Sequence, residues 1–179
     1  MSSFPPEDIR SFLTCCAGEW LTLRSRFTAE EGEQPDADDE GWHRSERGEL
    51  VVTYLPPREE DDPGGLAITP PATPGEAGLT RHLIFSAGGR FRGGLALADP
   101  AAVDLWREGT WLLRPDGSLE LTLEAETAVV HERIWFTKPN LRLRSSIEHR
   151  RDGRRGGASF SSEIRRVAPP TPPPDDSPR

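Results

Sequence analysis

The stretch from Glu132 to Ser146 constrains this chain more than any other segment, because it predicts a strand, a tight turn and a second strand. Ile134-Trp135-Phe136 has the β-branched and aromatic residue types that strands favour. Pro139-Asn140 is a turn dipeptide, since proline fixes φ and asparagine tolerates the left-handed region. The next four residues, Leu141-Arg142-Leu143-Arg144, alternate strictly, so both arginines share one strand face and both leucines share the other.

The alternating arginines allow two interpretations. Charged residues that alternate with leucines usually form a solvated face over a buried apolar one, and periodicity alone favours that arrangement. The alternative is a binding surface for a ligand with two carboxylates. The strand rise places Arg142 and Arg144 about 7 Å apart. Each guanidinium offers a planar fork that fits one carboxylate.

The rest of the chain predicts one short helix and many short strands. Ile9, Phe12, Leu13 and Cys16 form an apolar stripe at helical spacing, and Gly18 is expected to end that helix. Strands are expected at residues 19–27, 66–69, 79–85, 90–98, 109–113, 119–126, 127–136, 141–149 and 158–166. Residues 42–53 are expected to form either a weak strand pair, broken at Gly48, or one long strand. Short strands separated by turn signals predict an antiparallel barrel or sandwich, and the residues alone do not separate the two.

The composition argues against several functions and locations. A net charge of −8 argues against general nucleic-acid binding, which needs a basic surface. No apolar run is long enough to cross a membrane. The adjacent Cys15 and Cys16 provide no disulfide framework, which favours a reducing compartment. We therefore expect a cytoplasmic protein with no nucleic acid and no membrane as partner.

Two further expectations come from the histidines and from the end of the chain. His43, His82, His131 and His149 show no metal-ligand spacing, so no metal site is expected. Residues 168–179 contain six prolines and cannot pair in a sheet, so a disordered Pro-rich tail is expected after a domain of residues 1–167.

Several segments resemble the signature of the S-type (CpcS/CpeS) phycobiliprotein lyases. They are Glu132–Phe136, Pro139–Ser146, Ala158–Arg165, and the start Gly18-Glu19-Trp20 followed by Arg24-Ser25. The resemblance is close over residues 109–166 and 9–26 and weak over residues 27–108. It implies an all-β fold, a lipocalin-like (calycin) antiparallel up-and-down β-barrel with an N-terminal helix that closes one end.

The resemblance also implies an activity. Members of this family act as phycobilin lyases: they bind an open-chain tetrapyrrole non-covalently and attach it through a thioether bond to a cysteine of an apo-phycobiliprotein α or β subunit. The expected substrate is phycoerythrobilin or phycocyanobilin, with no permanently bound cofactor. A homodimer and a second lyase subunit are both left open. The alternative is a non-catalytic bilin carrier or chaperone of lipocalin type.

The same resemblance implies roles for individual residues. Arg142 and Arg144 are expected to bind the two propionates, and Ser146 continues their face with a hydroxyl. Glu132 is expected to act as the catalytic carboxylate, which faces the pyrrole nitrogens and keeps the bilin cationic, so that ring A becomes more electrophilic. Arg24 is a further ligand-binding candidate, for which a surface arginine is the plainer alternative.

The remaining candidates are aromatic and thiol side chains. Trp42 is expected to form a wall of the ligand cavity. Family members often carry a histidine shortly after the Arg-Ser of the first strand, where this chain has Arg26 and Phe27. Cys15 and Cys16 are expected to be small buried residues on the helix stripe rather than covalent carriers.

Overall fold

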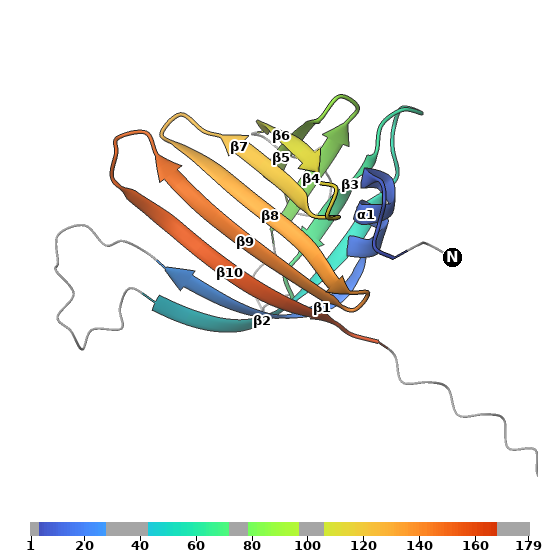
Figure 1. Cartoon of the computed structure of the whole chain (residues 1–179), viewed down its shortest axis with the longest axis horizontal. Coiled ribbons are helices and arrows are strands. Elements are labelled where there is room, and N and C mark those ends of the chain that lie inside the picture. The colour runs from blue at the N-terminus through green and yellow to red at the C-terminus, as the bar shows by residue number, and fades with distance from the viewer. Residues whose placement is uncertain (1–3, 28–42, 72–78, 97–105, 168–179) are drawn as a thin grey trace, which may run out of the picture.

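The computed structural model describes residues 4–27, 43–71, 79–96 and 106–167. The elements are α1 (Ile9–Cys16), β1 (Gly18–Phe27), β2 (His43–Leu55), β3 (Gly64–Thr69), β4 (Thr80–Ser86), β5 (Arg90–Ala96), β6 (Arg107–Leu113), β7 (Leu119–Glu124), β8 (Ala128–Lys138), β9 (Leu141–Arg150) and β10 (Arg155–Arg165). Each strand pairs antiparallel with its neighbour in sequence, and β10 pairs with β1, so the sheet closes into a barrel (Figure 1). The predicted all-β, lipocalin-like up-and-down barrel with an N-terminal helix is confirmed.

The observed strands follow the predicted ones with small shifts at their ends. β2 is one continuous strand that runs through Gly48. Pro139 and Asn140 form the turn between β8 and β9, and Gly88 and Gly89 both take a φ of 81° in the turn between β4 and β5. Trp42 and the proposed tail of residues 168–179 lie outside the described residues. In the described part of the chain, no helix combines the length and hydropathy that a membrane crossing needs.

Helix α1 lies at one end of the barrel, against β2 and β3 (Figure 1). It begins at a capping box, in which the Asp8 carboxylate accepts a hydrogen bond of 2.8 Å from the Ser11 backbone N–H. At the other end the Arg165 guanidinium donates to the backbone carbonyls of Cys15 and Ala17. Arg165 therefore stabilises the carbonyl end of the helix and ties it to the last strand.

The apolar core fills the part of the barrel next to α1. It contains Phe12, Leu13, Cys16, Trp20, Val52, Leu66, Leu83, Phe85, Phe91, Leu119, Leu121 and Ile134. Phe136 joins the helix to the strands, because its ring centroid lies 5.3 Å from that of Phe12 and 6.2 Å from that of Trp20. Such ring contacts add to the free energy gained from burying the rings themselves.

The barrel turns the arginine face of β9 inward. Arg142 and Arg144 are only 4% and 7% exposed, whereas Leu21 and Leu23 on β1 are 41% and 47% exposed. The solvated arginine face that periodicity alone favoured is therefore wrong. The outward face carries an outer apolar surface that spans β8, β9, β10 and β1. We define it as Leu21, Leu23, Trp135, Leu141, Leu143, Phe160 and Ile164.

Candidate ligand-binding site

A cluster of charged side chains occupies the barrel interior beside the apolar core. The cluster consists of Arg24 on β1, Arg81 on β4, Glu132 on β8, Arg142 and Arg144 on β9, and Glu163 on β10. Inward residues recur at every second position of a strand, so the strands deliver these side chains to one space although they are far apart in sequence. Charged groups in a barrel interior need an oppositely charged side chain or a bound ligand as a partner, because water solvates them poorly there.

Arg142 belongs to an enclosed ion pair. Its Nε donates to the carboxylate of Glu163, and the two side chains are 5% and 2% exposed. The guanidinium carbon lies 4.5 Å from the ring centroid of Trp20, within the range of a cation–π contact. Arg142 is not among the residues that line the cavity beside Arg144. Its assignment to a propionate stays a prediction.

Arg144 belongs to a second ion pair, which borders the cavity. Its Nη2 donates to Oε1 of Glu132 at 2.6 Å, and Nη1 of Arg81 lies 3.7 Å from Oε2 of the same carboxylate. Burial raises the pKa of Glu132, but the guanidiniums of Arg144 and Arg81 together hold it below its usual range. Glu132 is therefore ionised at neutral pH and shared between two cations.

The interior cluster carries more positive than negative charge. Four of its members are arginines and two are glutamates, which leaves two positive charges without a carboxylate. Within the described residues no carboxylate lies within 4.0 Å of Arg24, and the buried Nε of Arg144 has no hydrogen-bond partner. Burial and then the charge of Arg144 lower the pKa of Arg24. Arginine nevertheless remains protonated at neutral pH, so both charges persist.

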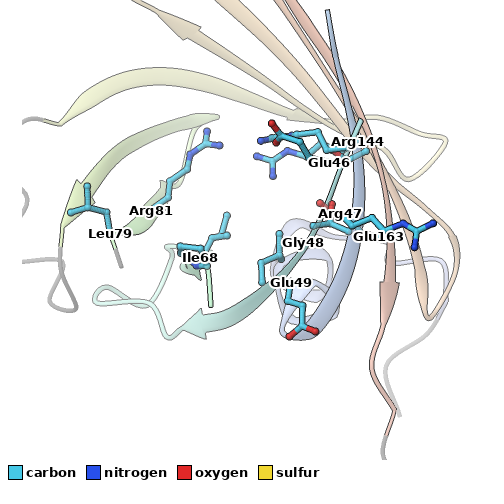
Figure 2. A pocket seen from close by; sticks show the side chains of 14 residues that line it. Glu46, Arg47, Gly48, Glu49, Ile68, Leu79, Arg81, Arg144 and Glu163 are labelled. Atoms are coloured by element: carbon cyan, nitrogen blue, oxygen red, sulfur yellow. The ribbon is translucent and has the colours of Figure 1, made fainter. Parts of the chain in front are cut away.

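A cavity of about 280 Å³ adjoins this charge excess. Its lining includes Arg24, Arg81, Arg144 and Ser161, with Leu50 and Ile68 as apolar walls. Arg81 and Arg144 extend toward one another from facing walls (Figure 2). Arg24, Ser161 and Arg144 are direct neighbours across β1, β10 and β9, so a buried hydroxyl lies between two arginines in one row of the sheet.

The remaining predicted residues are placed as follows. Ser146 is half-buried and is the direct cross-strand neighbour of Glu132. Arg24 lines the cavity, so it is not a plain surface arginine. Burial raises the pKa of both Cys15 and Cys16, which keeps these thiols protonated. Trp42 lies outside the described residues.

Arg81 and Ser161 line the cavity wall, and neither was predicted from the sequence pattern. Arg81 stands in Leu79-Thr80-Arg81-His82-Leu83-Ile84-Phe85, a strand dominated by apolar and β-branched residues. One charged residue at an inward position of such a strand is the signal that could have found it. Ser161 has no comparable signal, because a serine in a strand is compatible with either face.

A closed antiparallel barrel with a charged interior cavity defines the class of the protein. Barrels of this size enclose one small ligand, and the ligand is oriented by a few polar groups placed among apolar walls. An interior with two excess positive charges favours an anionic ligand. The chain therefore has the fold of the lipocalin-type barrels, a class that commonly holds one small ligand.

Comparison with known proteins narrows this class. The family model described as CpeS-like protein matches residues 90–166. The chain is 38% identical to chromophore lyase CpcS/CpeS 1 of Paulinella chromatophora over 92% of this chain and 91% of that protein. It is 48% identical to chromophore lyase CpcS/CpeS 2 of Synechococcus sp. (strain JA-3-3Ab) over 36% of this chain and 34% of that protein. The chain belongs to the CpcS/CpeS family of chromophore lyases.

A solved structure shares the fold. The S-type phycobiliprotein lyase CPES from Guillardia theta aligns with 90% of this chain and 94% of its own, with a TM-score of 0.59 and 20% sequence identity. At this identity the comparison concerns the barrel and not individual side chains.

Proposed function

We propose that the protein is a phycobilin lyase, which holds an open-chain tetrapyrrole non-covalently in the barrel and attaches it through a thioether bond to a cysteine of an apo-phycobiliprotein α or β subunit. Family membership supports this activity. The observation that carries the choice of ligand is the excess of two positive charges in the interior cluster of four arginines and two glutamates, three of whose arginines line the cavity. A bilin has two propionates, which match the two excess charges in number and sign.

The residue roles follow from the charge balance. The row of Arg24, Ser161 and Arg144 would hold one propionate, because the Nε of Arg144 is free to donate. Glu132 would face the pyrrole nitrogens as an ionised carboxylate and keep them protonated, with the Ser146 hydroxyl beside it. Trp42 remains a proposed wall of the cavity. Arg142 would act as a positioning residue that holds Glu163 in the cavity wall.

The nucleophile would come from the acceptor subunit. Its thiolate sulfur forms a bond to the ethylidene carbon of ring A, the π electrons of that double bond shift into ring A, and one proton is taken up, so nothing leaves. The lyase contributes orientation and exclusion of side reactions. Cys15 and Cys16 are poor candidates for this role because burial raises their pKa values.

The cavity volume indicates how the ligand would sit. A volume of about 280 Å³ is near the lower limit for sites that bury a small molecule, roughly 300 Å³. We therefore place the propionate-bearing centre of the bilin in the cavity and ring A toward the opening. An acceptor cysteine could then reach ring A without entering the barrel.

The outer apolar surface supports a protein partner. Exposed apolar patches of this kind mark interaction sites more often than isolated exposed residues do. The acceptor subunit, a second copy of the chain and a second lyase subunit would each bury it. Sedimentation of the protein alone and with each acceptor separates these partners. Ile164→Asp should abolish the association without changing bilin binding.

The activity is tested by coexpression with a bilin-synthesis pathway and a panel of apo-phycobiliprotein subunits. The readout is covalent bilin fluorescence of the subunit on a denaturing gel. We expect a fluorescent band that requires this protein, that is lost with Arg144→Gln, and that is retained with Arg90→Gln on the exposed side of β5. A coloured purified protein without a fluorescent band would support the carrier instead. A purified protein without colour, together with the absence of a fluorescent band, would overturn bilin binding altogether.

A further inference from the structure

Arg81 stands apart from the other charged residues of the interior. It comes from β4, whereas Arg24, Arg142, Arg144, Glu132 and Glu163 come from the contiguous strands β8, β9, β10 and β1. Its side chain extends from the β4 wall in the direction of Arg144 (Figure 2). Both Arg81 and Arg144 line the cavity, and the side chain of Arg81 is 35% exposed whereas that of Arg144 is 9% exposed.

Arg81 interacts less closely with the Glu132 carboxylate than Arg144 does. The Glu132 carboxylate lies 3.7 Å from Arg81 and 2.6 Å from Arg144, so the hydrogen-bond distance belongs to Arg144. Burial lowers the pKa of Arg81, and the positive charge of Arg144 acts in the same direction. Burial and the charge of Arg144 therefore disfavour the charged form of Arg81 more than the shared Glu132 carboxylate favours it.

The carboxylates that line the described cavity are engaged by arginines other than Arg81. Glu163 pairs with Arg142. Glu46 lies 3.6 Å from Arg26, and Glu49 lies 3.0 Å from Arg166. None of these three glutamates forms an ion pair with Arg81 among the described residues. The positive charge of Arg81 is therefore only partly compensated, so Arg81 could bind an anion that enters the cavity.

We propose that Arg81 binds the second carboxylate of the ligand, opposite the one held by Arg24, Ser161 and Arg144. The two anchors lie on facing walls, so the site selects a tetrapyrrole with two free, ionised propionates over its esters. This inference rests on the proposed function, because it names the second propionate of the bilin as the group that the same cavity would bind. It differs from the Arg142–Arg144 pair that the strand spacing indicated, since Arg142 is enclosed with Glu163 and Trp20.

The test combines esterified ligands with substitutions. Purified wild type, Arg81→Gln, Arg81→Lys and the exposed control Arg90→Gln are titrated with phycocyanobilin and with its dimethyl ester, and binding is followed by absorbance. We expect wild type and Arg90→Gln to prefer the diacid. Arg81→Gln should lower affinity for the diacid about 10- to 100-fold, as for loss of a charged hydrogen bond, and leave affinity for the diester unchanged. Arg81→Lys should retain part of the preference, because it keeps the charge.

The outcomes distinguish the possible failures. Equal loss of diacid and diester affinity in Arg81→Gln would show that Arg81 acts only through Glu132, and it would overturn the proposal. An unchanged preference would do the same. If wild type binds neither ligand, the proposed function itself fails. Thermal unfolding of each variant confirms that the titrated protein is folded, and Arg81→Lys supplies the comparison if Arg81→Gln does not fold.

Discussion

Two buried arginine–glutamate pairs lie two residues apart on the same face of β9, yet their surroundings differ. In the first pair Arg142 lies against the Trp20 ring away from the cavity, and its charge is balanced by Glu163, which lines the cavity wall. Arg144–Glu132 borders the cavity, shares its carboxylate with Arg81, and leaves the Arg144 Nε without a partner in the described structure. A repeated arginine–glutamate pair can therefore stabilise the fold at one position and supply a binding group at the next, depending on whether the arginine charge is already compensated.

The largest expected effect is a loss of stability in Arg142→Ala. Truncation leaves the Glu163 carboxylate buried without its partner, and breaking a buried pair in this way costs about 3–5 kcal/mol of unfolding free energy. Urea unfolding measures the loss. The double variant Arg142→Met, Glu163→Leu should recover most of it, because both charges are then removed. A stable Arg142→Ala that has lost bilin binding would reverse the roles assigned to the two pairs.

The second effect is a loss of bilin binding in Arg144→Gln. The substitution removes a charged donor from the cavity, which should raise the dissociation constant for bilin about 10- to 100-fold. Stability should fall less than in Arg142→Ala, since Glu132 keeps Arg81 as a partner. Absorbance titration and urea unfolding of the same samples separate the two quantities. If Arg144→Gln is the less stable variant and binds normally, the comparison fails.

A smaller effect is expected when the cavity is filled without altering a charge. Gly48 lies beside Thr22 on β1, and a Cβ there would be 3.3 Å from the Thr22 methyl group, so only a slight shift is needed. Gly48→Leu should occupy cavity volume and weaken bilin binding about tenfold. The fold should survive, because glycine inside a strand is itself unfavourable. Wild-type affinity in a folded Gly48→Leu would place the ligand elsewhere.

The smallest effect concerns pH. Folding lowers the pKa of Glu132 below its ordinary value of 4.5, so the carboxylate adds stability above that value and loses it as pH falls through the lowered pKa. The difference in unfolding free energy between wild type and Glu132→Gln should therefore be constant from about pH 8 to pH 5 and shrink below that range. A difference that already shrinks between pH 7 and pH 5 would mean that the pKa is raised, and that burial outweighs the two guanidiniums.

Much of the fold could be predicted from residue patterns, and the site only in part. The strand–turn–strand of Glu132 to Ser146, the helix stripe and most strand positions depend on local periodicity and turn chemistry, which act over a few residues. Glu132 and Arg144 were found through the family signature. Arg81 was not, because its relation to Arg144 arises from two strands on facing walls, some sixty positions apart in the chain.

The alternation in Leu141–Arg144 determined by itself that the two arginines share a strand face and that the leucines take the other. Only closure of the barrel decided that the arginine face points inward and the leucine face outward. Only the packing of α1 and Trp20 decided that Arg142 is enclosed while Arg144 meets the cavity. The physical reason is that a period of two assigns residues to faces, whereas burial and charge balance depend on which other strands surround each face.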